Sequence, residues 1–107
     1  MRILLDECVD ERLRLSLAPH DCQTARFAGF AGLTNGALLS AAEAAGFEVV
    51  LTVDRHMPDQ QTFVNRRIAL LIIRSKTSRL VDLKELVPHI LETMASIGPG
   101  QIVTVGS

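Results

Sequence analysis

Three short apolar runs, each followed directly by a charged residue, constrain the fold of this chain more than any other feature. They cover residues 3–5, 49–53 and 68–73. Short runs rich in Val, Ile and Leu with polar boundaries are typical of strands buried on both faces of a parallel sheet. A weaker run at 102–105 predicts a last or edge strand, and residues 21–25 are a further strand candidate.

Helical patterns lie between these runs. Apolar residues recur at four-residue steps between residues 9 and 17, and an Ala-rich stretch covers 36–45. Thr34 and Asn35 are both candidate N-caps for the second helix, and Gly46 is well placed to end it. Strands that alternate with helices predict an α/β domain with a parallel sheet.

A third amphipathic pattern extends from Leu83 to Met94 and contains Pro88. A proline inside a helical pattern predicts either a kink or the first turn of a new helix, which would start near Val87. The interval between residues 54 and 67 has room for a crossover but not for a long helix.

Composition narrows the class of protein further. The chain has 107 residues, of which 48% are hydrophobic and 21% charged, so we expect one domain, 1–107, with a real core rather than a disordered chain. No apolar run reaches the roughly 18 to 20 residues of a membrane span, and Asp6 and Glu7 interrupt the first run too early for a secretory signal. We therefore expect a cytoplasmic protein with no membrane partner.

Charge and cysteine content argue against a nonspecific nucleic-acid-binding protein and against a metal site built on cysteines. The formal net charge is −1, so the chain has no large basic field that would attract nucleic acid nonspecifically. Arginine supplies most of the cations, and its guanidinium suits a small phosphate-binding site. Cys8 and Cys22 fit no metal-binding spacing. No histidine is placed to activate Cys8, and we interpret it as a packing residue.

Two of the predicted strands end in carboxylates. Asp6, followed by Glu7, closes the first run and Asp54 closes the second. Ligands of open α/β sheets bind outside the carboxyl ends of the strands, where these acids converge if the strands are neighbours. Converging carboxylates suit Mg²⁺ or Mn²⁺, which neutralises a phosphodiester transition state and activates water. The alternative is that both residues simply begin turns, a common role for Asp.

The loop after the second strand-end acid carries further candidates. His56 suits proton transfer or phosphate contact, and Asp59 suits either a metal ligand or a turn after Pro58. Arg55, Arg74 and Arg26 are candidates to hold phosphate at the rim of the site. For His56 and for each arginine taken alone, a solvated surface side chain is the more common role.

The order and spacing of three motifs resemble the small bacterial PIN-like proteins related to VapC-type toxins. The motifs are residues 3–7, Ile-Leu-Leu-Asp-Glu; residues 32–36, Gly-Leu-Thr-Asn-Gly; and residues 51–55, Leu-Thr-Val-Asp-Arg. The resemblance covers nearly the whole chain and includes the apolar strand from Ile68 and the last helix.

The resemblance implies a PIN-like three-layer α/β fold with a central, mostly parallel sheet of four to five strands, and RNA cleavage that depends on Mg²⁺ or Mn²⁺. It maps the metal-binding acids onto Asp6 and Asp54. The candidate catalytic residues are Asp6, Asp54, Glu7 and His56, and the candidate RNA-binding residues are Arg55, Asn35 and Arg74. A toxin of this kind implies an antitoxin partner, for which the exposed side of the last helix or an edge strand are candidate surfaces, as they are for a homodimer.

The chain departs from this family at two points. Relatives usually carry an acid at the start of the second helix, where this chain has Asn-Gly-Ala at 35–37. Many read Asp-x-Asp-Phe after the third strand, where this chain has Asp-Arg-His-Met at 54–57. Either Glu7, Glu43 or Asp59 replaces the missing acids, or the domain has lost its metal and is a non-catalytic binding module.

A signalling receiver domain is a further alternative. Receivers place acids after the first strand and a phosphoacceptor Asp after the third, which Asp6 and Asp54 match. Ser75 suits the Ser or Thr that receivers carry after the fourth strand. The Lys that they carry after the fifth strand has no counterpart, because only Gly106 and Ser107 follow Val105.

Overall fold

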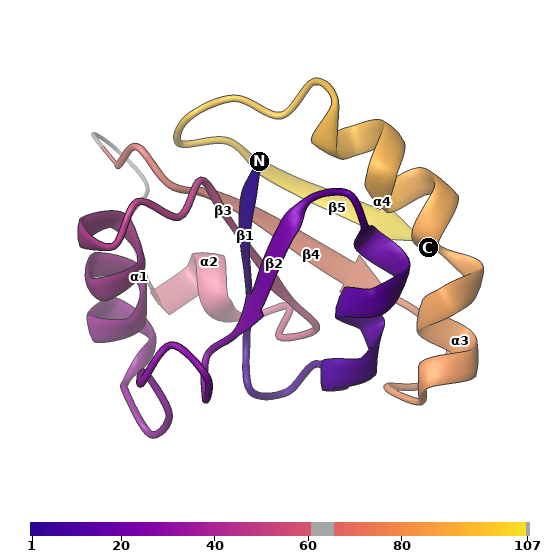
Figure 1. Cartoon of the computed structure of the whole chain (residues 1–107), viewed down its shortest axis with the longest axis horizontal. Helices are drawn as coiled ribbons and strands as arrows, with labels where there is room; N and C mark the ends of the chain where they lie inside the picture. The colour runs from indigo at the N-terminus through magenta and orange to yellow at the C-terminus, as the bar shows by residue number, and fades with distance from the viewer. Residues whose placement is uncertain (61–65, 107) are drawn as a thin grey trace.

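Five strands form one sheet in which every neighbouring pair is parallel (Figure 1). The computed structural model describes residues 1–60 and 66–106, and the side chains of these residues except 59 and 60. The strands are β1 (Arg2–Leu5), β2 (Asp21–Thr24), β3 (Val49–Thr52), β4 (Ala69–Arg74) and β5 (Ile102–Gly106). The predicted α/β class is confirmed, and the sheet is entirely rather than mostly parallel.

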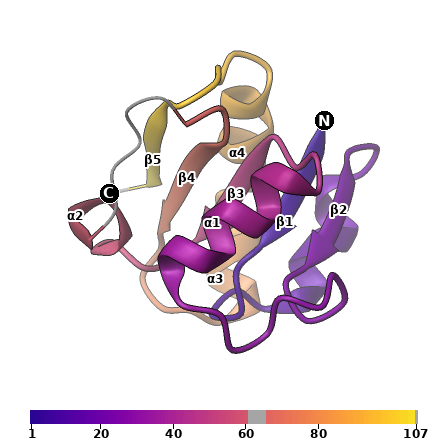
Figure 2. The same cartoon turned by 90° about the vertical axis from the view of Figure 1, so that its left-hand side faces the viewer.

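Helices cover both faces of the sheet, so the domain has three layers (Figures 1 and 2). The helical elements are the 3₁₀ helix η1 (Glu11–Leu17) and the α-helices α1 (Asn35–Ala44), α2 (Met57–Gln60), α3 (Leu80–Glu85) and α4 (Val87–Met94). Helices η1, α3 and α4 pack together on one face, whereas α1 and α2 lie on the other. Within 1–60 and 66–106, no helix is long and apolar enough to cross a membrane.

The apolar runs are continuous because each strand is buried from both sides. Along β1, Ile3 and Leu5 belong to the core under η1, α3 and α4, and Leu4 belongs to the core under α1. Strand β3 alternates in the same way, with Val49 and Leu51 on the first side. Successive side chains of a strand point to opposite faces, so a strand between two helical layers has no position for a polar residue.

Local sequence explains most of the helix boundaries. Thr34, rather than Asn35, is the N-cap of α1, and its hydroxyl accepts a hydrogen bond from the Ala37 N–H. Gly46 follows the helix with a φ of 85°, a left-handed conformation that favours glycine. Helix α4 begins at Val87 with Pro88 in its first turn, so the second of the two predicted alternatives is correct.

The segment after β1 differs from the predicted α-helix, since it forms the 3₁₀ helix η1. Its buried residues are Leu13 and Leu17, as the four-residue steps predict, but Val9 lies before the helix begins. A 3₁₀ helix rises about 2.0 Å per residue, compared with about 1.5 Å in an α-helix. For the same number of residues, the 3₁₀ helix therefore spans more of the distance from the carboxyl end of β1 back to the amino end of β2.

The strand order, β2-β1-β3-β4-β5, locates the part of the sheet where a ligand site is expected. From β1 the chain moves to β2 on one side, and it later returns to β3 on the other side. The loops that leave the carboxyl ends of β1 and β3 consequently diverge, and a crevice opens between them. This topological switch point is where open α/β sheets bind their ligands.

Candidate functional site at the carboxyl edge of the sheet

The Thr52 hydroxyl at the switch point links the carboxylate of Asp6 to the backbone N–H of Asp54. Asp6 follows β1 directly, and its backbone N–H donates to the carbonyl of Leu51 in β3 at 2.9 Å. The buried Thr52 hydroxyl donates to Oδ2 of Asp6 at 2.8 Å and accepts from the backbone N–H of Asp54 at 3.0 Å. Thr52 thus fixes both acidic residues relative to the core.

The carboxylate oxygens of this acid pair are only partly occupied by protein donors. Asp6 accepts from the Glu7 N–H on Oδ1 and from the Thr52 hydroxyl and the Cys8 thiol on Oδ2. In Asp54, Oδ1 accepts from the His56 N–H at 2.9 Å, and no described residue donates to Oδ2. A carboxylate has about four lone-pair positions, so both side chains keep capacity for another ligand.

The Cys8 thiol lies against the acid pair, with its sulfur 3.4 Å from both Oδ2 of Asp6 and the hydroxyl oxygen of Thr52. Burial raises the pKa of this thiol, the hydrogen bonds from Thr52 and the Val53 backbone lower it, and the negative charge of Asp6 raises it further. The net rise keeps the sulfur protonated at neutral pH. The raised pKa argues against a nucleophilic role, but Cys8 is exposed, so its prediction as a packing residue is wrong.

The remaining candidates near this edge differ in their contacts and exposure. Oε1 of Glu7 accepts the Gly32 N–H at 2.6 Å, so one of its oxygens ties the β1–η1 loop to the segment before α1. Asn35 is the first residue of α1, and the side chain of His56 is exposed. The structure therefore gives Glu7 a positioning contact that the sequence does not indicate.

Glu43 does not replace a missing acid, and this expectation is wrong. It lies near the end of α1, where it accepts hydrogen bonds from the Arg66 guanidinium at 2.6 Å and the Arg67 N–H at 2.9 Å. Both arginines precede β4, so Glu43 belongs to the amino edge of the sheet, opposite the acid pair. The side chain of Asp59, the other proposed replacement, lies outside the described residues.

Two pockets of opposite charge flank the acid pair along the carboxyl edge. A pocket of about 280 Å³ beside β1 and β2 is lined by Asp6, Glu7, Asp10, Glu11 and Arg26, and we call it the acidic pocket. A pocket of about 370 Å³ beside β3 and β4 is lined by Arg55, Arg74 and Lys76 and by the hydroxyl residues at 75, 77 and 78, and we call it the cationic pocket. Two of the predicted phosphate-binding residues therefore share one pocket, whereas Arg26 lies in the other.

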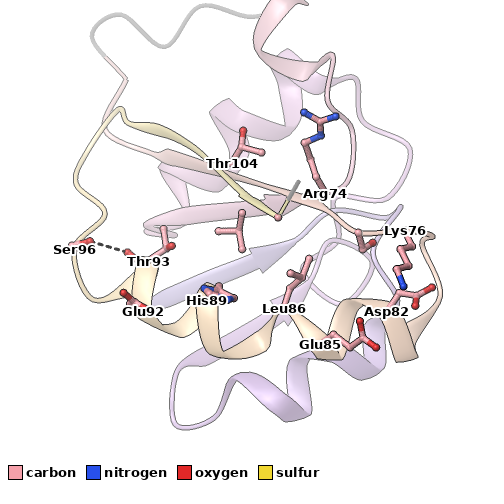
Figure 3. Close-up of a pocket in the computed structure, with 13 residues that line it drawn as sticks. Arg74, Lys76, Asp82, Glu85, Leu86, His89, Glu92, Thr93, Ser96 and Thr104 are labelled. Atoms are coloured by element: carbon pink, nitrogen blue, oxygen red, sulfur yellow. Dashed lines mark hydrogen bonds between the residues drawn. The ribbon is translucent and has the colours of Figure 1, made fainter.

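A larger pocket, of about 620 Å³, lies between β5 and helices α3 and α4 (Figure 3). The helices contribute Glu85, His89 and Glu92 to its wall. Neither Asp6 nor Asp54 lines this larger pocket, so we do not assign the reactive site to it despite its size. It adjoins the cationic pocket, because Arg74 and Lys76 contribute to both.

The donor set at the acid pair fits a hard divalent cation with few protein ligands. Within the described residues, no three side chains of His, Cys, Asp or Glu are grouped so as to hold one ion. Mg²⁺ keeps several waters and often uses only one or two carboxylates, which Asp6 and Asp54 can supply. Asp6 and Asp54 could therefore supply at most two carboxylates to such an ion, and water would complete its coordination.

Thr52 is the site residue that sequence reasoning missed. It is the one polar side chain that is buried in the described part of the chain. A signal is present in the sequence, because Thr52 interrupts the apolar run 49–53 close to the strand-end acid. A buried hydroxyl needs a hydrogen-bond partner, and the end of a parallel strand offers one in the following loop.

A comparison of this chain with protein-family models, curated proteins and solved structures finds no match. The fold and the geometry at the carboxyl edge are therefore the observations from which a function is inferred.

Proposed function

We propose that this protein is a PIN-like ribonuclease that hydrolyses RNA phosphodiesters with the help of Mg²⁺ or Mn²⁺. The observation that carries the proposal is the link that the Thr52 hydroxyl makes between the carboxylate of Asp6 and the backbone N–H of Asp54, at the switch point of a parallel sheet. Resemblance to the PIN-like family supports the reaction and the substrate class. The placement of both acids at the carboxyl ends of two neighbouring strands supports the divalent cation.

In this proposal Asp6 and Asp54 hold the ion, and Thr52 holds the two acids in place. The bound ion supplies charge that stabilises the phosphodiester transition state and lowers the pKa of water. In the overall reaction a water oxygen bonds to phosphorus, one P–O ester bond breaks, and a water proton ends on the departing alkoxide oxygen. His56 lies on the loop that Asp54 organises, and we assign it the protonation of that oxygen.

The biological role that we propose is that of a toxin held inactive by an antitoxin protein. Its support is the resemblance, together with two surfaces that an antitoxin or a second copy of the chain suits. One is the exposed side of α4, and the other is the outer edge of β5, which among the described residues pairs only with β4. A free strand edge offers backbone donors and acceptors to an added strand.

Cleavage of a labelled single-stranded RNA with added Mg²⁺ or Mn²⁺ tests the proposed reaction. We expect Asp6→Asn and Asp54→Asn each to lower the rate at least about 100-fold, since charge stabilisation by a metal contributes several kcal/mol. Asp10→Asn is the matched control, because it removes a nearby carboxylate that is paired with Arg12 instead. Activity that survives both site substitutions would eliminate the proposed centre.

If no form of the protein cleaves RNA, a measurement of Mn²⁺ binding distinguishes the remaining alternatives. If neither ion promotes cleavage and calorimetry detects no Mn²⁺ binding, the chain is the non-catalytic binding module considered above. Binding of Mn²⁺ that Asp6→Asn abolishes would instead retain the metal centre and reject only the RNA substrate.

The strand order favours one second candidate, a phosphoacceptor domain of the receiver type. Receiver domains have the order 2-1-3-4-5, which this sheet shares, and Asp54 follows the third strand. Incubation with a small phosphodonor, followed by intact-mass measurement, tests it. A gain of one phosphoryl group that Asp54→Asn abolishes would replace the nuclease proposal, and an unchanged mass would reject the receiver alternative.

A further inference from the structure

We propose that Arg55, Arg74 and Lys76 form a subsite for a phosphate group of single-stranded RNA, next to the phosphate that is cleaved. The inference rests on the proposed function, and it adds the position and composition of a substrate contact outside the acid pair. The three cations line the cationic pocket, at the carboxyl ends of β3 and β4. Val53 and Arg55 both contribute to that pocket, so it borders the position of Asp54.

All charged residues that line this pocket are positive, and the carboxylate of Asp82, which accepts a hydrogen bond from Thr77 of the lining, borders it. No carboxylate lines it. Elsewhere, arginines form ion pairs, as in Arg2–Asp21, Arg12–Asp10 and Arg66–Glu43. Within the described part of the chain, none of the three pocket cations has such a pair. Grouped cations repel one another, so the arrangement is most stable when an anion occupies the pocket.

The orientation of Arg74 supports this assignment. In Figure 3 its side chain extends away from helices α3 and α4, which carry the carboxylates of the larger pocket. Arg55 and Arg74 are both exposed, which leaves their guanidinium groups accessible to a ligand from solvent. A guanidinium presents parallel N–H donors that match two oxygens of one phosphate group.

The loop that follows β4 is held in one conformation by its own hydroxyl groups. The Ser75 hydroxyl donates to the Thr77 carbonyl, and the Thr77 hydroxyl donates to the Asp82 carboxylate. The Arg79 N–H in turn donates to the Thr77 hydroxyl oxygen at 3.1 Å. Lys76 and Ser78 are carried on this fixed loop, which lowers the entropic cost of ordering them around a ligand.

The geometry favours a phosphate of an RNA chain over the other anions that such a pocket could hold. A cationic pocket that borders Asp54 accepts one phosphate while the acid pair acts on the neighbouring one. The grouped positive charge disfavours a second metal ion there. Electropositive grooves that follow the backbone are the usual way in which single strands are held without sequence preference.

Fluorescence anisotropy of a labelled single-stranded RNA of eight nucleotides, with a chelator present to prevent cleavage, tests the subsite. We expect Arg55→Gln and Arg74→Gln each to weaken binding about threefold to tenfold, and to reduce the slope of log K against log salt by about 0.7. Arg14→Gln is the matched control, since it removes one exposed cation from η1 beside β2, away from the cationic pocket. It should change the affinity less than about twofold.

The outcomes separate this inference from the proposed function. Cleavage that needs Asp6 and Asp54, combined with RNA binding that is unchanged in Arg55→Gln and Arg74→Gln, would overturn the subsite alone. Equal losses in Arg14→Gln would also overturn it. RNA binding that depends on Arg55 and Arg74, without cleavage under either metal, would support the subsite and reject the nuclease.

Inorganic phosphate identifies the source of the bound group. We expect it to displace the RNA only at concentrations at least about tenfold above those at which unlabelled RNA does so, because one ion replaces only one of several phosphate contacts. Equal potency would overturn the assignment to an RNA chain. Thermal unfolding of each variant checks that the fold is intact. We expect substitution of these exposed arginines to leave the midpoint of unfolding unchanged.

Discussion

The two edges of the sheet use their charged residues in opposite ways. At the amino edge, charges are paired: Arg2 lies over the Phe47 ring at 4.5 Å and forms an ion pair with Asp21, and Glu43 is paired with Arg66. At the carboxyl edge, Asp6 and Asp54 form no ion pair with described residues, and neither do the cations of the cationic pocket. Asp10 and Arg12 form an ion pair at that edge, and Arg26 lies among the acids of the acidic pocket, so the charges there are separated by sign only in part.

This difference teaches which charges stabilise the fold and which are available to a ligand. Paired charges lower the energy of the folded chain by themselves, whereas separated charges of one sign are stabilised only when something else binds. The contrast therefore predicts that substitutions at the two edges have different consequences for stability and for binding.

The strongest test of the contrast is Thr52→Val, which keeps the shape of the side chain and removes its hydroxyl. The Asp54 N–H loses its acceptor and Asp6 loses a buried donor, so we expect the free energy of unfolding to fall by about 1–3 kcal/mol. RNA cleavage should fall with it. Denaturant unfolding and the cleavage assay measure the two effects.

Thr104→Val is the control for this substitution, because Thr104 is an exposed strand residue in β5. A loss of cleavage in Thr104→Val equal to that in Thr52→Val would contradict the positioning role of the buried hydroxyl.

A smaller effect, confined to stability, is expected for Glu43→Gln at the amino edge. Partial burial raises the pKa of Glu43, but the hydrogen bonds from the Arg67 N–H and the Arg66 guanidinium lower it more, so its pKa lies below the usual value. The ionised form therefore stabilises the fold at neutral pH, and this contribution is lost as the pH falls below about 4.3, the usual pKa of Glu. We expect a loss of about 1 kcal/mol at pH 7.

Urea unfolding between pH 7 and pH 3 measures this contribution. The parent protein and Glu43→Gln should converge in stability at the acid end of the range. RNA affinity should be the same for both, and a change in affinity would break the separation between the two edges.

The smallest effect concerns the reactivity of Cys8. The charge of Asp6 raises the pKa of this thiol, so Asp6→Asn should lower the pKa and increase the rate of alkylation at pH 8 about twofold to threefold. Iodoacetamide labelling followed by mass spectrometry measures the rate. Cys22 contributes little, because burial raises its pKa to about 12. An unchanged rate in Asp6→Asn would contradict the contact between Asp6 and Cys8.

Much of the fold could be predicted because its signals are local and repeated. The apolar runs predicted β1, β3 and β4, and the weaker run predicted the edge strand β5. Pattern alone could not distinguish the 3₁₀ helix η1 from an α-helix, because both bury Leu13 and Leu17. Strand order is also absent from such patterns, since it depends on contacts between distant segments.

The candidate site was less predictable than the strands, because it depends on contacts between segments that are distant in the sequence. A parallel sheet brings all carboxyl ends to one edge, so the convergence of Asp6 and Asp54 follows once β1 and β3 are neighbours. The location of Glu43 at the opposite edge depends on the length of α1, which carries it back toward the amino ends. Thr52 was missed because its role arises from hydrogen bonds that cross between strands.

The burial of Thr52 has a consequence for how the protein responds to heat. A reactive centre built on surface loops usually loosens before the rest of the molecule, since loops open with little free energy. Here the hydroxyl that joins the two acids belongs to β3, which lies between β1 and β4 in the interior. The acids should consequently keep their relative placement until the whole domain unfolds, so inactivation by temperature is expected to coincide with the cooperative melting of the sheet.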